Sequence, residues 1–395
     1  MSIVKYKKHN NSGIHLGYIK ITNLINKMKK IGLLSMLLIS SIFLQMGCST
    51  HSKMNVDNSE WQVFPSNMPS PQTKQIQTAI PGYNRLITST YLTYPEWYIV
   101  YNSQEYADYL KSHLPSSFPY FSSISQYWWG YNAVNHITKN RFPPDRGDHL
   151  MLSVIGTSYS LEYLIKGLYE NSVGKFTELL SGNEPTEEDS YGQKIAEEYA
   201  NYIPKAPWFD FSYIRALSGL WTKTSLVGPH MIRKTERKLI FSVEYSIKAV
   251  YASIIRVGSH LTYGTVDSNV YALANNVPRN IYKKYKNIKH VRSINTKTDI
   301  ISLPNEQPFT EAITKMINSG AQFKDIAGNS EILVTAVTPR NWVFKNKNAQ
   351  LLFTINILTQ PTLHRIAIRI PTKSLLTILK YLQENNAVIE HVYAY

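Results

Sequence analysis

The sequence predicts an α+β protein in which a helical domain precedes a smaller domain of strands and helices. Apolar residues recur at helical spacing from about residue 85 onward, whereas three segments in the last quarter alternate apolar and polar residues like half-buried strands. Of the 395 residues, 43% are hydrophobic and 17% are charged, which excludes an intrinsically disordered chain and predicts one or two globular domains. A single cysteine excludes a disulfide scaffold and a cysteine-rich zinc module.

Residues 1–47 have the composition of a secretory signal peptide. They contain seven Lys and no Asp or Glu, and Met28 is followed by two Lys and an apolar run over 31–44. A short basic region, an apolar run of about 7 to 15 residues and a small residue before the cleavage site define such a signal. The run is too short to span a bilayer. Because residues 1–27 add a polar leader that export does not require, we expect translation to begin at Met28.

The only cysteine follows this run directly, in the segment Leu44-Gln45-Met46-Gly47-Cys48. The segment resembles the lipobox of bacterial lipoproteins, in which the Cys is lipidated and becomes the mature N-terminus. The family usually has Leu three residues before the Cys, where this chain has Gln. The resemblance implies a protein held at a membrane by acyl chains on Cys48. Ser rather than Asp after the Cys implies the outer membrane, facing the periplasm; the alternative is an ordinary signal peptide or an uncleaved anchor.

Residues 48–84 are rich in Ser, Asn, Gln, Thr and Pro and lack periodicity, which predicts a lipidated tether. An aromatic-rich, irregular helical domain is expected over 85–275. Proline at an early helical position opens its first helix near Tyr94, and Asp148 is placed to cap a second. The expected later helices, separated by proline-containing loops, cover 149–180, 187–202 and 233–260.

The α/β domain is expected over 293–395, after a basic stretch that ends near Arg292. Helices begin at Pro308 and Pro371, each with apolar residues on one face. The strands expected around them cover 297–303, 322–326, 332–336, 353–357, 366–370 and 387–395. This order, strand, helix, three or four strands, helix and strand, predicts a ferredoxin-like α/β sandwich with an extra hairpin.

A ten-residue pattern, S-[LV]-E-Y-x-I-K-x-[LV]-Y, occurs at 160–169 and again at 242–251. On a helix, the Glu and the Lys of each copy face one another four residues apart. The pattern predicts two paired helices whose Glu–Lys pairs are surface or bridging contacts. The alternative is that Glu162 or Glu244 acts as a general acid or base beside a Tyr hydroxyl in a cleft. One match of this length leaves open whether the whole domain is duplicated.

A metal site has weak support in the sequence. His136, Asp145, Asp148 and His149 place nitrogen and oxygen ligands near one another along the chain, but Asp148 also stands where a helix needs its cap. The chain contains no H-E-x-x-H motif, P-loop, nucleophile elbow or dinucleotide fingerprint. We therefore expect neither a bound metal nor another cofactor.

Two further segments are candidates for binding. A dense aromatic segment is either the core of the helical domain or a stacking surface for a protein or cell-wall partner. A basic segment with interleaved Tyr is either a solvated linker or a site for lipid head groups and polysaccharides. Nucleic acid is not expected, because seven of the Lys residues belong to the exported signal. The residues singled out in these segments are Trp97, Tyr127, Trp128, Trp129, Lys283, Lys284 and Lys286.

These observations predict a membrane-anchored cell-envelope lipoprotein with a binding or structural role and no catalytic activity. Its expected partners are the membrane, through lipidated Cys48, and an envelope protein or cell-wall component. The alternative is a cell-wall or lipid hydrolase that uses Glu162 or Glu244 as its general acid or base.

Overall fold

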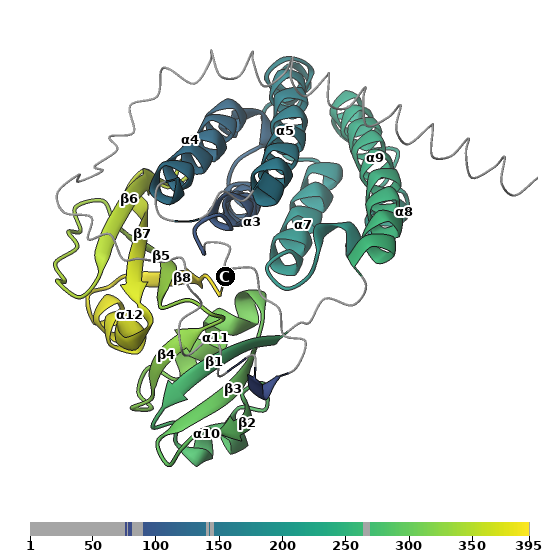
Figure 1. Cartoon of the computed structure of the whole chain (residues 1–395). Helices are drawn as coiled ribbons and strands as arrows, with labels where there is room; N and C mark the ends of the chain where they lie inside the picture. The colour runs from purple at the N-terminus through teal and green to yellow at the C-terminus, as the bar shows by residue number, and fades with distance from the viewer. Residues whose placement is uncertain are drawn as a thin grey trace, which may run out of the picture. The chain divides into compact units, whose positions relative to one another are not determined.

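The computed structural model describes residues 76, 78–80, 90–139, 142, 146–263 and 269–394, with the side chains of 257–263 excepted. It confirms the α+β class, since a helical region is followed by antiparallel sheets with their own helices (Figure 1). The predicted signal peptide, Cys48 and most of the predicted tether lie outside the described residues. Among the described helices, none combines the length and the apolar character needed to cross a bilayer.

The first long helix begins where its proline predicts, whereas the helix that Asp148 is expected to cap begins two residues earlier, at Arg146, so that Asp148 lies in its first turn. Pro95 lies in the first turn of the first described long helix, and Thr186 forms a capping box with Asp189 at the start of another. The helix that starts at Arg146 runs through a π-helical turn without breaking. The elements are α3 Tyr94–Tyr109, η1 Pro115–Ser117, α4 Tyr120–Thr138, α5 Arg146–Tyr169, η2 Glu170–Gly174, α6 Lys175–Leu180, α7 Glu187–Tyr202, η3 Trp208–Asp210, α8 Tyr213–Lys223 and α9 Met231–Tyr263.

The helical region consists of two copies of one three-helix unit, which we call repeat 1 (residues 94–180) and repeat 2 (residues 187–263). The elements α3, η1 and α4 of repeat 1 correspond to α7, η3 and α8 of repeat 2, each starting 93 positions later (187 − 94). The third helices, α5–α6 and α9, carry the two copies of the ten-residue pattern. A second match supports the correspondence, EYADYL at 105–110 and EYANYI at 198–203.

The two repeats also share their internal contacts. The indole nitrogen of Trp128 donates to Ser160 Oγ at 2.9 Å, and that of Trp221 donates to Ser242 Oγ at 2.9 Å. The hydroxyls of Tyr98 and Tyr191 donate to the equivalent carbonyls of Ser123 and Ala216. The edge-to-face ring pair Tyr106–Phe118 recurs as Tyr199–Phe211. The ten-residue match in the sequence is therefore one part of a duplication of the whole three-helix unit.

Two small sheets follow, each four-stranded and fully antiparallel within the described residues. The first has the order β2-β3-β1-β4 and the connectivity βαββαβ, which is ferredoxin-like. The second has the equivalent order β6-β7-β5-β8, with a loop over 340–349 in place of the first helix. The elements are β1 Asn269–Asn275, α10 Arg279–Lys284, β2 Lys289–Ser293, β3 Thr298–Pro304, α11 Glu306–Lys315, β4 Gln322–Ile326, β5 Glu331–Pro339, β6 Gln350–Asn356, β7 Leu363–Pro371, η4 Thr372–Ser374, α12 Leu375–Glu384 and β8 Val388–Val392.

The strands thus form two sheets of one topology, where the sequence predicts a single sandwich with an extra hairpin. Both sheets contribute to one hydrophobic core, together with α11 and α12. The first sheet takes in residues 269–293, ahead of the predicted start of the α/β domain. Every residue of the edge strand β2 is exposed, so this strand has no apolar alternation that a sequence pattern could reveal.

Repeat 1 packs against the second sheet. Tyr94 makes an edge contact with Phe353, with ring centroids 5.0 Å apart, and Trp97 stacks on His391 at 3.4 Å. Buried Arg365 of β7 pairs with Glu105 of α3 at 3.0 Å. Repeat 2 has its own core, formed by α7, α8 and α9. The two repeats are alike internally and differ in what surrounds them.

Candidate functional site

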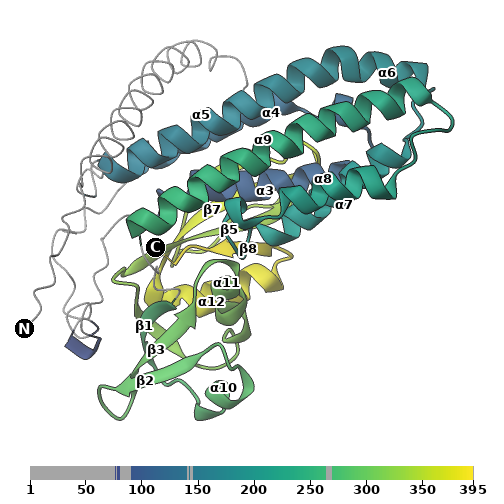
Figure 2. The same ribbon diagram turned by 90° about the vertical axis from the view of Figure 1, so that its right-hand side faces the viewer.

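The charged residues of the repeated pattern come together between α5 and α9 in a cluster that we call the Glu–Lys ring, Glu162, Lys166, Glu244 and Lys248. Each Lys makes a short contact with the Glu of the other helix, since Lys166 Nζ–Glu244 Oε1 and Lys248 Nζ–Glu162 Oε1 are both 2.8 Å. The contacts within each helix are 3.8 Å and 3.0 Å. This exchange of partners means that α5 and α9 run antiparallel, as Figure 2 shows. The duplication therefore creates the ring.

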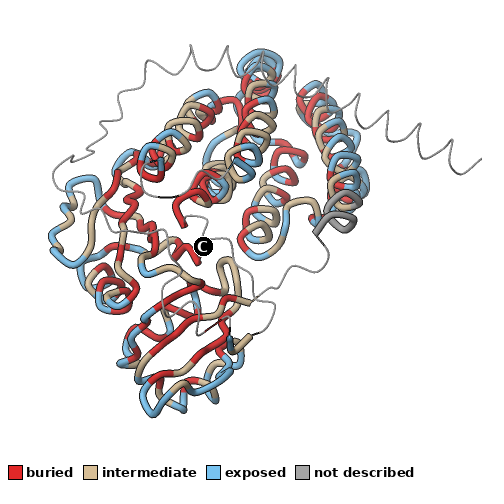
Figure 3. Tube along the Cα trace, viewed as in Figure 1, coloured by how far each residue is buried: buried red, intermediate tan, exposed pale blue. Residues whose placement is uncertain are grey.

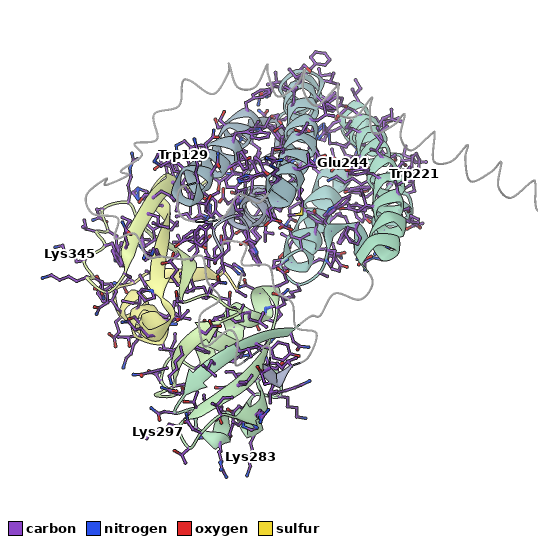
Figure 4. All side chains as sticks on the ribbon, in the orientation of Figure 1. Trp129, Trp221, Glu244, Lys283, Lys297 and Lys345 are labelled. Carbon is purple, nitrogen blue, oxygen red and sulfur yellow. The ribbon has the colours of Figure 1, made fainter. Side chains whose placement is uncertain are left out.

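The ring lines a cavity of about 100 Å³ among α3, α5, α7 and α9. Figure 4 labels Glu244 in the region of α5 and α9. The four ring side chains are 17–39% exposed, so water reaches them inside the bundle. Lys166 lies over the ring of Tyr106 at 5.2 Å, and Lys248 lies 5.8 Å from the ring of Tyr199. Tyrosines of both repeats therefore contact the two ammonium groups.

The mutual pairing fixes the charge of three of the ring members, Glu244, Lys166 and Lys248. Burial alone would raise the pKa of Glu244, but the ammonium groups of Lys166 and Lys248 outweigh it and hold that pKa at about 2. Burial opposes the charge of both Lys residues, yet the carboxylates raise the pKa of each above its ordinary value. Glu244 is therefore ionised at neutral pH and holds no proton to donate, and the two Lys residues stay protonated.

The histidines that could have completed a catalytic site lie elsewhere. Neither His136 nor His149 is among the described residues that line the cavity. His136 is exposed near the end of α4, and His149 Nδ1 lies 3.1 Å from the hydroxyl of Tyr131. The ring is thus neither a pair of isolated Glu–Lys contacts on a solvated face nor a site that joins carboxylates to a histidine.

The candidate metal ligands do not assemble among the residues that the structure describes. No group of three or more His, Cys, Asp or Glu side chains there has the geometry to hold a metal ion. Asp148 lies in the first turn of α5, and Asp145 falls outside the described residues.

The aromatic candidates lie mostly in the interior. Trp97 and Tyr127 are buried, and the hydroxyl of Tyr127 donates to the carbonyl of Leu152 at 2.7 Å. Trp128 is bound to Ser160, and Trp129 makes an edge contact with Phe353 of the second sheet at 5.5 Å. Their contacts favour a role in the core and in the attachment of repeat 1 to the sheet.

The basic candidates lie on the surface of the first sheet's domain. Lys283 and Lys284 end α10, Lys286 follows it, and all three are exposed. Figure 4 shows Lys283 and Lys297 directed outward at the same end of this domain. The segment belongs to a folded unit with an exposed basic end, which differs from the solvated linker that the sequence suggests.

The fold also raises the pKa of a carboxyl group that the sequence does not single out, that of Glu306. Burial and the nearby carboxylate of Glu96 raise the pKa of Glu306 to about 7. Glu306 opens α11, and Glu96 lies in the first turn of α3. The two are 210 residues apart (306 − 96), and no local pattern marks either one, so only the tertiary fold reveals the pair.

Comparisons of the chain with models of protein families, with characterised proteins and with solved structures yield no significant match.

Proposed function

We propose that this chain is a membrane-anchored cell-envelope lipoprotein that acts by binding or as a structural component, without catalysis. The observation that supports a role without catalysis is that each Glu of the Glu–Lys ring pairs with the Lys of the other helix. Both carboxylates of the strongest sequence candidates contact ammonium groups at 2.8 Å, and the pKa of Glu244 is held at about 2. A general acid needs a pKa near the working pH, and a carboxylate with so low a pKa is a weak base.

The anchor is proposed from the lipobox-like segment that ends at Cys48. Two or more acyl chains on this residue would hold the protein stably at the membrane, with the predicted tether between the lipid and the folded region. The decisive measurement is mass spectrometry of the mature N-terminus in a bacterial host. We expect an N-terminal peptide that begins at acylated Cys48. An unmodified peptide that contains residues before Cys48 would overturn the anchor.

A hydrolase that uses Glu162 or Glu244 is the competing function. The double variant Glu162→Gln/Glu244→Gln tests it, because it removes both carboxylates and keeps their shape. In cells that depend on the protein, we expect the variant to retain the envelope phenotype in proportion to the amount of folded protein. A variant that is folded and present at normal levels but has lost all function would favour the hydrolase.

Partners of the binding function remain an envelope protein or a cell-wall component. The exposed Lys283, Lys284 and Lys286 supply positive charge for anionic lipid head groups or polysaccharides, at about 1 kcal/mol per charge near an anionic surface. Replacing the three with Gln should weaken sedimentation of the protein with anionic vesicles and leave its unfolding unchanged. Equal sedimentation of both forms would exclude this surface as the binding site.

A further inference from the structure

The outward faces of α5–α6 and α9 carry an exposed apolar surface of unusual extent. Six residues of the repeated pattern define what we call the outer apolar face, and they are 44–63% exposed. Figure 3 shows exposed residues along the outward sides of these helices. The six residues are Leu161, Ile165 and Leu168 on α5 and Val243, Ile247 and Val250 on α9.

The face is free of charge because the ring takes up the charged residues beside it. Between residues 150 and 169 the only charged side chains are Glu162 and Lys166, and between 239 and 255 they are Glu244 and Lys248. All four pair with one another in the cavity. A partner that covered the face would therefore bury no unpaired charge, which is the main electrostatic cost of an interface.

The spacing of the six residues is that of a helix–helix seam. The intervals of four and three residues, 161, 165, 168 and 243, 247, 250, are those at which apolar side chains interdigitate between packed helices. The pattern occurs once on each of two antiparallel helices, so a half turn about an axis through the ring brings the face onto itself. A contact between two copies of such a face matches equivalent residues, as in an isologous dimer.

The face is close in size to one side of a standard dimer interface. Exposed apolar residues continue it along α5–α6 as far as Leu180 and along α9 as far as Ile254. At about 1.5 Å of length per residue and about 10 Å of width per helix, residues 150–180 and 239–254 present roughly 700 Å². A standard interface buries about 800 Å² per partner, and the largest apolar patch of a typical monomer is about 300 to 600 Å². A helix that lies on a bilayer carries Lys or Arg along its polar side, and residues 150–169 and 239–255 have none outside the ring. On the continuation along α6, Lys175 pairs with Glu178 of the same helix.

We propose that the outer apolar face binds a second copy of this chain, so that α5 and α9 of two molecules form a four-helix contact. This inference goes beyond the proposed function and does not depend on the lipid anchor.

The test is site-specific photocrosslinking of the full-length chain in a bacterial host that co-expresses two differently tagged copies. A photoreactive phenylalanine analogue replaces Ile165 or Ile247 in one copy. We expect an adduct between the two tags from both positions. The matched control replaces Val388 of β8, which is 66% exposed and lies away from the face, and should give no such adduct.

A second measurement disrupts the contact with two charged substitutions. Ile165→Glu/Ile247→Glu should lower co-isolation of the two tagged copies at least tenfold and leave the helical content measured by circular dichroism unchanged, because both positions are exposed. Adducts only with lipid, with residues 1–75 of the same chain or with another protein, or no adduct at all, would overturn the inference. Repeating the crosslinking with a Cys48→Ser chain separates the dimer from the lipid anchor. If the adducts disappear in this chain, the anchor and not the outer apolar face causes the association.

Discussion

Repeat 1 and repeat 2 share one architecture, but their equivalent residues have different environments. Glu105 of repeat 1 is buried and pairs with Arg365 of the second sheet. Its equivalent in repeat 2, Glu198, pairs with Arg215 in a contact that is open to solvent. The comparison teaches that the duplicated sequence determines the three-helix unit, whereas the neighbours decide which polar residues become buried.

The first turns of α3 and α7 also differ, but here the buried acidic residue belongs to repeat 2. Asp189 of α7 pairs with buried Arg233 at 2.8 Å, in a network of charged side chains that links η2, α7 and α9. At the equivalent position of α3, Glu96 lies near a second carboxyl, that of Glu306, and raises its pKa. Repeat 2 therefore pairs the acidic residue at the start of its first helix with a cation. In repeat 1 the equivalent carboxylate lies near a second carboxyl group, that of Glu306, whose charged form burial also disfavours.

The largest effect is expected from the buried contact of repeat 1. Arg365→Met removes the cation that contacts both Glu105 and Glu390, and leaves the buried carboxylate of Glu105 and the half-buried one of Glu390 without it. We expect a loss of about 3 to 5 kcal/mol in the free energy of unfolding, measured with urea at pH 7. Arg215→Met, at the exposed pair of repeat 2, should cost less than about 1 kcal/mol. Similar losses in both variants would contradict the contrast between the repeats.

The ring, which joins the repeats, should give the next largest effect. Glu244→Gln should cost about 2 to 3 kcal/mol at pH 7, because two Lys residues lose their carboxylate partner. The pKa of Glu244 is lowered in the folded state, so its contribution is present above about pH 4.5 and is lost as the pH falls towards 2. Urea unfolding of wild type and variant should therefore converge at low pH.

The matched control for the ring is Glu384→Gln, which alters an exposed pair with Lys380 at 3.9 Å. It should change the free energy of unfolding by less than about 0.5 kcal/mol at any pH. A difference between wild type and Glu244→Gln that stays constant down to pH 2.5 would show that the carboxylate of Glu244 is not stabilised by charge.

Glu306 tests the other half of the comparison and has the opposite sign. Its folded pKa of about 7 is raised, so its contribution to stability is full below about pH 4.5 and is lost as the pH rises through 7. Glu306→Gln should therefore be more stable than wild type by about 1 to 2 kcal/mol at pH 8 and equal to it near pH 4.5. Glu311→Gln, an exposed position of the same helix, serves as the control and should show no such trend.

The smallest effect is expected where the repeats are most alike. Trp128→Phe removes the hydrogen bond to Ser160 and should cost about 1 kcal/mol. Trp221→Phe removes the equivalent bond to Ser242, but its side chain is 48% exposed, and the cost should be less than about 0.5 kcal/mol. Thermal unfolding of the two variants measures the difference. A larger loss of stability in Trp221→Phe would contradict the expectation that the less exposed hydrogen bond contributes more.

Much of the fold could be predicted from local periodicity. The helices over 187–202 and near Tyr94, and the strands around Val334, Ile355 and Ile368, have the apolar spacing that their burial requires. The division into two sheets could not be predicted. The consecutive strands β4 and β5 belong to different sheets, and no local sequence pattern indicates with which strand each of them pairs.

The candidate site was predicted in its residues but not in its contacts. The pattern places Glu and Lys four residues apart on each helix, whereas the shortest ion pairs join different helices and depend on the antiparallel packing of α5 and α9. The duplication left a second signal in the sequence, EYADYL and EYANYI, that the helical spacing alone does not bring out. Three of the six aromatic residues of α3 have no aromatic equivalent in α7, and these three contact the second sheet: Tyr94, Trp97 and Tyr101. The two copies have therefore diverged where repeat 1 meets the sheet.

The exchange of partners within the ring has a consequence for how such a domain can arise. A chain with one three-helix unit would carry both halves of each short pair on a single helix, and could close the same ring only with a second chain. Joining two units in one polypeptide turns that bimolecular step into an intramolecular one, at an effective concentration on the order of millimolar for a short connection. The ring then forms whatever the abundance of the protein, and each half is free to acquire its own surroundings.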